Sequence, residues 1–390
     1  VKMKKNHVFA LLILCIILVM TFFYMKKEEM KHIQGSETGI GTPVFNDLDL
    51  DKISSIKIFS GDQEKVTMLK NNDVWTVANL YDYPADPSKL RSLTLDVATM
   101  KNMKSLQAAK SQLDRLGLDS DSVNTPPTKA EFGSKDAKIA EFLAGKMHTR
   151  KSDDDPMMEI SDGRFILRSE TKDPLLADKT LSELDLQATD WLDKTFLSSG
   201  KLKKASLSNG VKTIWELKRD DIKQDMKLDP LPKNSEVDSS KTGAISSALE
   251  QMGFIEIADP GTKTEESGLD KPKIFCAEDF DGITYRLKIG AKKANAYYVK
   301  VEAEYKESPL SKDKENDKPE ESEKIEEEHA EKQKSSRMKV EEISKKYSPW
   351  IYMISENKIN PIIAEYEELL KKKDDGPNKN QTTTQNKNLN

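Results

Sequence analysis

The side chains that most often carry catalysis or metal binding are few and scattered along this chain. No two of the four histidines, His7, His32, His148 and His329, have the spacing of metal ligands on one helix. Cys276 is the only cysteine outside the apolar N-terminal stretch, so the sequence offers it no second thiol. The sequence contains no Gly-x-Ser-x-Gly elbow and no phosphate-binding Gly-Lys-Ser/Thr loop. We therefore predict no catalytic residue, no metal ligand and no cofactor.

Two weaker patterns have simpler explanations. Ser198 and Lys201 fit a Ser-x-x-Lys spacing, which a chain with this many lysines produces by chance. Residues 153–155 are three aspartates without the alternating ligands and distal glutamate of a calcium loop, so we interpret them as a solvated acidic turn. With 67 acidic residues, some carboxylates will meet by chance, and the sequence identifies no acid–base pair for hydrolysis. We predict that the protein is not an enzyme.

Residues 6–25 carry no Asp, Glu, Lys or Arg, and this stretch determines where the rest of the chain works. As a helix it would rise roughly 30 Å, the thickness of one hydrocarbon core. We predict a short basic N-tail at 1–7 and a single transmembrane anchor at 8–25, which makes the lipid bilayer the first expected partner. The anchor side chains are Val8, Phe9, Leu11, Leu12, Ile13, Leu14, Ile16, Ile17, Leu18, Val19, Phe22 and Phe23. The alternative is a cleavable signal peptide, although no small-residue cleavage pattern follows the stretch.

The orientation of the anchor depends on its flanks. Three lysines precede the span and three follow it closely, so the positive-inside rule is balanced. Because a short tail before a first span usually stays cytoplasmic, we predict that the large C-terminal domain lies on the periplasmic or outer side of a bacterial inner membrane.

The bulk composition describes a large, mildly acidic domain after the anchor. Hydrophobic residues make up 36% of the chain and charged residues 33%, with a formal net charge of -5. The length allows two domains, or one domain with tails. No excess of positive charge is available to bind a phosphate backbone, so we predict no nucleic-acid partner.

The chain after the anchor is expected to begin with a flexible stalk at 26–44 and a first α+β repeat at 45–172. Alternation at Ile56 and Ile58 predicts a strand, and the polar residues 71–73 predict a hairpin turn. Asp86 is a good N-cap and Pro87 a good first residue for a helix with one apolar stripe. That stripe consists of Leu90, Leu93, Val97 and Met100. Later strands are expected around 139–144 and 165–167.

The same order of Gly, Pro and apolar positions recurs further along the chain, at an offset that rises from 148 to 152 and then falls to 132. Because glycine and proline mark backbone constraints, this order predicts an internal duplication with a second α+β repeat at 201–305. The second helix is expected to start near Ser239 or Ser240 and end at Gly253, and Lys223 stands opposite Trp75. The matched positions are Gly61 and Gly210, Leu69-Lys70 and Leu217-Lys218, Pro84 and Pro232, Leu93 and Ile245, Met100 and Met252, Gly117-Leu118-Asp119 and Gly268-Leu269-Asp270, Gly145 and Gly290, and Phe165-Ile166 and Tyr297-Tyr298.

The remaining segments connect or extend the repeats. Residues 173–200 are expected to be a linker with a short helix, whose Trp191 could pack between the repeats. Residues 306–346 form a charged, low-complexity insertion that is either disordered or a solvated helix, and we favour an insertion that protrudes. Residues 347–373 are expected to complete the second repeat with a strand and a helix that Asn360 caps and Pro361 starts. Residues 374–390 are expected to be a disordered tail.

Together these patterns predict an α+β fold, with two similar modules of β-meander and helix in tandem after a single N-terminal transmembrane helix. One aromatic cluster in the first module could have a role beyond packing. Trp75, Tyr81 and Tyr83 lie on a strand and its exit loop, where most aromatic side chains belong to the core. The functional interpretation is an aromatic interaction patch beside the helix start at Asp86, presented to a partner.

Several of these motifs together resemble a known bacterial family, domain of unknown function 4340. They are Val74-Trp75-Thr76-Val77, Tyr83-Pro84-Ala85-Asp86, the helix from Leu90 to Met100, Gly117-Leu118-Asp119, Asp190-Trp191-Leu192-Asp193-Lys194 and the closing strand and helix after Trp350. The resemblance covers residues 47–373, with the charged run as an insertion, and the second repeat departs from it by lacking the tryptophan. It implies a membrane-anchored, envelope-facing protein, similar to auxiliary parts of gliding-type ABC transport systems. It supplies no catalytic residues.

Three functions remain in view. The first is a non-enzymatic accessory or scaffold protein that holds a protein partner in a membrane complex. The second is a binding module with a ligand cleft between the two repeats, since seams of this kind often hold ligands. The third is a hydrolase that uses carboxylates alone, for which the sequence shows no acid–base pair.

Overall fold

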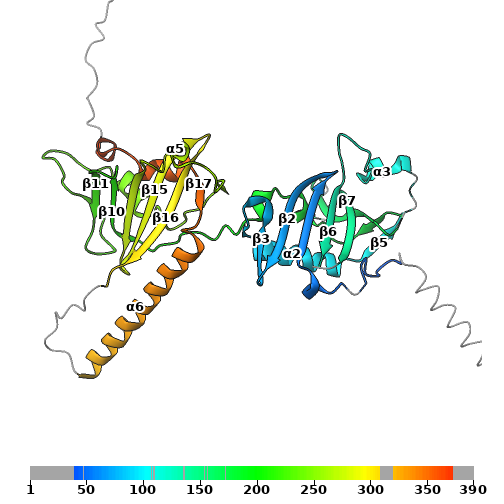
Figure 1. Ribbon diagram of the computed structural model, residues 1–390, viewed down its shortest axis with the longest axis horizontal. Coiled ribbons are helices and arrows are strands. Elements are labelled where there is room, and N and C mark those ends of the chain that lie inside the picture. The colour runs from blue at the N-terminus through cyan, green and yellow to red at the C-terminus, as the bar shows by residue number, and fades with distance from the viewer. Residues whose placement is uncertain are drawn as a thin grey trace, which may run out of the picture. The chain divides into compact units, whose positions relative to one another are not determined.

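The computed structural model describes residues 39–46, 48–106, 108, 110–134, 137–152, 154–155, 157–171, 173–307 and 319–371. The chain divides into two compact units, with the boundary between Asp193 and Lys194 (Figure 1). The predicted N-tail at 1–7, the anchor at 8–25 and the tail at 374–390 lie outside the described residues. Within the described part of the chain, no helix is both long and apolar enough to cross a membrane.

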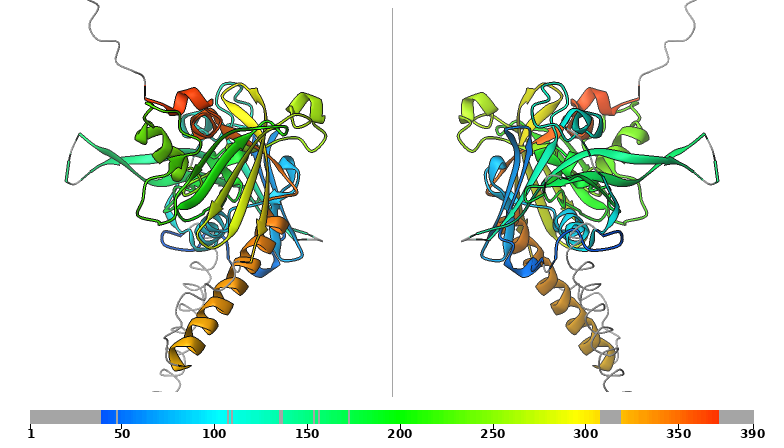
Figure 2. Two further views of the ribbon diagram at one scale, coloured as in Figure 1. Left: turned by 90° about the vertical axis from the view of Figure 1, so that its left-hand side faces the viewer. Right: turned by 90° about the vertical axis from the view of Figure 1, so that its right-hand side faces the viewer.

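The first unit is built on a nine-stranded sheet with the order β4-β3-β2-β1-β6-β7-β8-β9-β5, in which all neighbours are antiparallel. Figure 2 shows the β7–β8 hairpin extending past the rest of this unit. The strands are β1 Ser55–Ser60, β2 Gln63–Asn71, β3 Val74–Val77, β4 Tyr83–Pro84, β5 Asn102–Ser105, β6 Thr128–Gly133, β7 Lys138–Lys151, β8 Glu159–Arg168 and β9 Leu175–Ala177. The helices are α2 Pro87–Thr99 and α3 Lys110–Leu116, with 3₁₀ helices η1 Leu50–Lys52, η2 Ala78–Leu80, η3 Ser182–Asp185 and η4 Ala188–Trp191.

Short-range sequence patterns determine the hairpin turn and the helix in the first half of this unit, as predicted. Asn72 and Asp73 both have positive φ, 47° and 65°, which is the backbone that a two-residue hairpin loop requires. The Asp86 carboxylate accepts hydrogen bonds from the backbone N–H of Ser88 at 2.9 Å and of Lys89 at 3.3 Å, and so caps α2. The predicted apolar stripe of α2 is buried, which fixes the helix on its unit.

The second unit has an eight-stranded sheet with the order β12-β11-β10-β14-β15-β16-β17-β13, also antiparallel throughout. Its strands are β10 Leu202–Ser208, β11 Thr213–Lys218, β12 Lys227–Leu228, β13 Glu256–Ile257, β14 Lys273–Asp279, β15 Ile283–Lys293, β16 Ala296–Tyr305 and β17 Ile351–Ser355. Its helices are α4 Ser239–Ser246, α5 Thr264–Ser267, α6 Pro319–Lys346 and α7 Glu356–Ile359, with 3₁₀ helices η5 Asn360–Ile362 and η6 Tyr366–Leu369. The mixed class, with two sheets and few helices, is as predicted.

The two sheets share one strand order. Taken from β12 to β13, the second sheet matches β3-β2-β1-β6-β7-β8-β9-β5 of the first, strand for strand. The register slips at the same place in both first hairpins, between Ile58 and Phe59 and between Leu207 and Ser208. The topology therefore repeats along the chain in the order that the matched glycines and prolines suggest.

The repeated Gly-Leu-Asp motif has the same physical cause in both units. Gly117 and Gly268 follow α3 and α5 with φ of 69° and 67°, a left-handed backbone that favours glycine. Each of these turns lies against a strand glycine. A Cβ on Gly145 would lie 2.3 Å from the Leu116 carbonyl oxygen, and a Cβ on Gly290 would lie 2.1 Å from that of Ser267.

Several predicted boundaries differ from the structure. Residues 41–44 of the predicted stalk belong to the first unit, since Gly41 N–H donates to Asn102 O at 2.7 Å and Val44 N–H donates to Met100 O at 2.9 Å. The predicted linker at 173–200 contains β9, η3 and η4, which are part of the first unit. Trp191 is fully buried, and its carbonyl oxygen accepts from the Asp86 N–H of the same unit at 2.7 Å.

Two predicted helices are shorter than expected. The helix expected to reach Gly253 is capped by Asp238 and ends at Ser246, because serine, threonine and glycine dominate it and favour helix ends over helix interiors. No continuous helix follows Pro361 in the described residues. α7 ends at Ile359, before Pro361, since proline supplies no N–H to extend a helix, and the chain from Asn360 forms the 3₁₀ helices η5 and η6.

The residue of the second unit that corresponds to Trp75 is not the one that the sequence predicts. Trp75 pairs with Lys70 across β2 and β3, whereas Lys227 pairs with Lys218 across β11 and β12. Lys227 is therefore the structural counterpart of Trp75. The loop between β11 and β12 is longer than the hairpin turn at 72–73, which explains why a fixed offset points to Lys223 instead.

The charged insertion contains α6. Of the two predicted alternatives, disorder or a helix, residues 319–346 form a helix. The helix, orange in Figure 2, projects from its sheet. The Lys332 ammonium lies 2.8 Å from the Asp281 carboxylate, and the Ser336 hydroxyl donates to Asp281 O at 3.3 Å. Of the described positions of α6, those that are buried or half-buried are mostly polar: His329, Gln333, Ser336, Lys339, Val340, Ile343 and Lys346.

Candidate functional site

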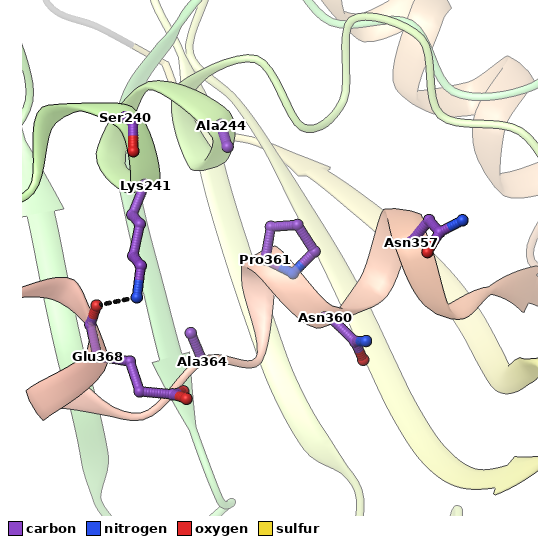
Figure 3. A pocket seen from close by; sticks show the side chains of 8 residues that line it. All are labelled: Ser240, Lys241, Ala244, Asn357, Asn360, Pro361, Ala364 and Glu368. Carbon is purple, nitrogen blue, oxygen red and sulfur yellow. Dashed lines mark hydrogen bonds between the residues drawn. The ribbon is translucent and has the colours of Figure 1, made fainter.

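A groove in the second unit is the best-formed candidate site (Figure 3). Its volume of about 470 Å³ is within the range of small-ligand pockets. One wall is the first half of α4, and the other is the segment formed by α7, η5 and η6. The lining residues are Ser240, Lys241, Ala244, Asn357, Asn360, Pro361, Ala364 and Glu368.

The α4 wall is fixed by its cap. The Asp238 carboxylate accepts from the Ser240 N–H at 3.0 Å and from the Ser240 hydroxyl at 2.7 Å. From the first turn of α4, the Lys241 ammonium crosses the groove and donates to Glu368 O at 2.6 Å, the dashed contact of Figure 3. This contact joins the two walls at one end and leaves the space between Ala244 and Pro361 open.

The wall formed by α7, η5 and η6 is held in place by side chains from the sheet. The buried Trp215 indole N–H donates to Ala364 O at 2.8 Å. The Lys273 ammonium lies 2.7 Å from the Glu365 carboxylate, and the Tyr297 hydroxyl donates to the Asn360 Oδ1 at 3.2 Å. These side chains come from β11, β14 and β16, so the sheet itself holds this wall in place.

The groove offers hydrogen-bonding groups suited to binding. Ser240 contributes a hydroxyl, Asn357 and Asn360 contribute carboxamides, and Ala244 with Pro361 contributes small apolar surface. The carboxylate beside the Ser240 hydroxyl is a weak base, because the hydrogen bond from Ser240 holds the pKa of Asp238 below its usual value. These hydroxyl and carboxamide groups can donate hydrogen bonds to a ligand and accept them from it.

The predicted aromatic cluster does not form a continuous exposed patch. Tyr83 is fully buried, Trp75 is half-buried, and Tyr81 is 39% exposed on a left-handed turn with φ of 60°. Tyr83 thus follows the core-packing interpretation, and a contact surface at this place would consist of Tyr81 and part of Trp75. The interaction patch as a functional site stays a prediction.

The other chemistry-bearing residues are dispersed. The His148 Nδ1 lies 2.6 Å from the Asp162 carboxylate, on the paired strands β7 and β8. Cys276 lies partly buried on β14 as a free thiol. In the part of the chain that the structure describes, no three His, Cys, Asp or Glu side chains are grouped to hold a metal ion.

One buried carboxyl of the second unit, whose pKa is raised, has a structural role. Asp279 is buried at the β14–β15 turn, where Oδ1 accepts from the N–H groups of Asp281 and Ile283, both at 2.9 Å. Its Oδ2 accepts from the Tyr285 hydroxyl at 3.2 Å. Burial raises the pKa of Asp279 and, together with that carboxylate, raises the pKa of Tyr285. These bonds hold the turn on which α6 rests through Asp281.

We expect the Asp279→Asn variant to lose part of the pH dependence of stability. The raised pKa means that the folded chain holds this proton more tightly than the unfolded chain. Its contribution is therefore complete below the ordinary value of 3.8 and is lost as the pH rises through the folded pKa. Urea unfolding from acidic to neutral pH should show a steeper fall for the natural chain than for the variant. Exposed Asp270→Asn is the control, and equal slopes in all three would contradict the assignment.

One spacing in the sequence indicates which segments meet at the groove. Lys89 and Lys241 both stand three residues after a helix-capping aspartate, and both donate to a carbonyl of a later 3₁₀ helix. That shared spacing marks the closing segment of each unit. The residues that line the groove could not be recognised from it, since they come from segments more than a hundred positions apart.

The fold and the groove together define a protein of two tandem antiparallel sheet units, of which the second carries the groove. Residues 75–272 match the family model described as Domain of unknown function (DUF4340). The chain belongs to this family, as the sequence resemblance predicted, and the match runs from β3 of the first unit to the start of β14 in the second. No curated protein and no solved structure matches the chain.

Proposed function

We propose that this protein is a membrane-anchored accessory protein without catalytic activity, which holds a protein partner on the periplasmic or outer side of a bacterial inner membrane. The observation that carries the proposal is the uncharged stretch at 6–25, placed ahead of two sheet units. A membrane complex supplies the partner, and an ABC transport system is the candidate that the family resemblance suggests.

Two features of the described residues support a binding role. The groove has hydrogen-bonding groups on a wall that Trp215 and Tyr297 hold in place. Because this wall is already ordered, less conformational entropy is lost on binding. The serine of the groove lies beside a carboxylate whose pKa is lowered, which disfavours proton abstraction. The ligand cleft between the two repeats is the alternative and stays a prediction.

Deleting residues 8–25 tests the anchor. We expect the full-length chain in the membrane pellet after a high-salt wash, and the deleted chain in the supernatant, because the apolar stretch supplies the insertion free energy. A matched control, Ile13→Leu with Ile17→Leu, keeps the stretch apolar and should stay in the pellet. Intact full-length protein in the supernatant would overturn the anchor.

The partner is tested separately by affinity purification from native membranes. Under mild detergents we expect the protein to co-purify in constant ratio with components of a membrane complex. Recovery of the protein alone under several such detergents would overturn the accessory role.

A further inference from the structure

The place in the first unit that corresponds to the groove is bridged by side-chain pairs. In the first unit, Asp86 N–H donates to Trp191 O at 2.7 Å and the Lys89 ammonium donates to Asp190 O at 2.8 Å. In the second, Asp238 N–H donates to Leu369 O at 2.9 Å, and Lys241 makes the matching contact with Glu368. The same helix start therefore meets the same closing 3₁₀ helix in both units.

Two side-chain pairs close this place in the first unit. The Ser92 hydroxyl donates to the Glu183 carboxylate at 2.5 Å, and the Lys179 ammonium lies 3.2 Å from the Asp96 carboxylate. Both pairs join α2 to the segment that leads into or forms η3. Together with Lys89 they make three links between the two walls.

The second unit has residues that cannot form either pair. Ser92 follows Lys89 by three positions as Ala244 follows Lys241, and Glu183 precedes Asp190 by seven positions as Pro361 precedes Glu368. By the same spacing, Asp96 corresponds to Ala248 and Lys179 to Asn357. The Ser–Glu and Asp–Lys pairs are thus replaced by Ala–Pro and Ala–Asn, and the space that they bridge in the first unit is the groove.

We propose that this groove binds a short extended peptide segment of a partner protein, an inference that rests on the proposed accessory function. The Asn357 carboxamide carries both a donor and an acceptor, and Asn360, whose Oδ1 accepts from Tyr297, adds its N–H donors. These groups match the C=O and N–H groups of a peptide main chain. Ala244, Pro361 and Ala364 form a small apolar surface for one side chain of that segment. The Lys241 ammonium already donates to Glu368 O, so the groove does not require a charged ligand.

The test introduces the Ser–Glu pair of the first unit at the corresponding positions of the second unit. Full-length protein in detergent is screened against a displayed library of short random peptides, and the enriched peptides are titrated against variants. Ala244→Ser with Pro361→Glu should weaken their binding at least about tenfold by filling the groove. Asn357→Ala, at an exposed position where folding is not at risk, should weaken it about fivefold by removing one hydrogen-bonding carboxamide. The matched control, Val211→Ser with Val123→Glu, makes the same changes in charge at fully exposed sites and should bind as the natural chain does.

The outcomes separate the ligand from the wider role. Enrichment of no peptide, or equal binding by the Ala244→Ser, Pro361→Glu variant, would overturn the proposal. So would displacement of the peptides by soluble oligosaccharides that shift the Asn357 and Asn360 carboxamide resonances, since the site would then be a carbohydrate site. Because purified protein is used, failure here leaves the membrane fractionation and co-purification results unchanged.

Discussion

Replacing Gly290 with alanine is expected to destabilise the second unit by roughly 3 kcal/mol, the upper end of the usual cost of overpacking. The new methyl group would lie 2.1 Å from the Ser267 carbonyl oxygen, and a backbone atom cannot move aside as a flexible side chain can. Gly145→Ala should have the same effect in the first unit, where the methyl would lie 2.3 Å from Leu116 O. Urea unfolding gives the free energies, and amide exchange in β14–β16 or β6–β8 locates each loss.

Gly243→Ala is the matched control for these substitutions. Gly243 lies within α4 and has open space around its Cβ position. Because alanine is the better helix former, this change should stabilise the second unit by about 1 kcal/mol. If Gly290→Ala or Gly145→Ala were as harmless as Gly243→Ala, the contact between turn and strand would not be the reason for these glycines.

The features that the sequence predicts well are those set by neighbours along the chain. The loop at Asn72 and Asp73 and the helix capped by Asp86 each depend on a few consecutive residues. Their backbone angles and capping bonds follow from side-chain chemistry alone. The matched glycines could also be found, because each marks a place where a Cβ is crowded or where the backbone is left-handed.

The features that the sequence does not predict depend on contacts between distant segments. The contact between Gly145 and the turn at Gly117 explains the paired motifs, but the sequence gives only their order. Most of the buried and half-buried positions described in α6 are polar, so no apolar stripe could decide between a helix and disorder. The groove arises from replaced pairs, Ser92–Glu183 and Asp96–Lys179, whose members are far apart in sequence.

Because the two units share one strand order, their residues can be compared position by position. The second unit has α6 between β16 and β17, and it lacks the two side-chain pairs that bridge the first. The α7–η5–η6 wall of its groove is bonded to the sheet through Trp215 and Tyr297.

Arg164→Met is expected to destabilise the first unit by roughly 3 kcal/mol. The guanidinium is buried, and it donates to Gly145 O at 2.9 Å, to Leu181 O at 3.0 Å and to the Asp185 carboxylate at 2.8 Å. Methionine keeps most of the apolar stem but removes the guanidinium donor to Gly145 O and one of two donors to Leu181 O, which still accepts from the Leu184 N–H at 3.1 Å. An unsatisfied buried carbonyl costs about 1–3 kcal/mol. The loss should appear in urea unfolding and in faster amide exchange of β7 and β8.

Asp185→Asn separates the ion pair from the carbonyl contacts. The Asp185 side chain is 45% exposed, so solvent screens the pair and its loss should cost about 1 kcal/mol or less. The larger effect of Arg164→Met should persist at high ionic strength, because hydrogen bonds to neutral carbonyls are little affected by salt. Equal losses in the two variants, or a loss in Arg164→Met that disappears with added salt, would assign the stabilisation to the ion pair instead. The counterpart of Arg164 at the offset of β16 is Ala296, so the second unit holds its closing segment without this guanidinium and relies on Trp215 and Lys273 in its place.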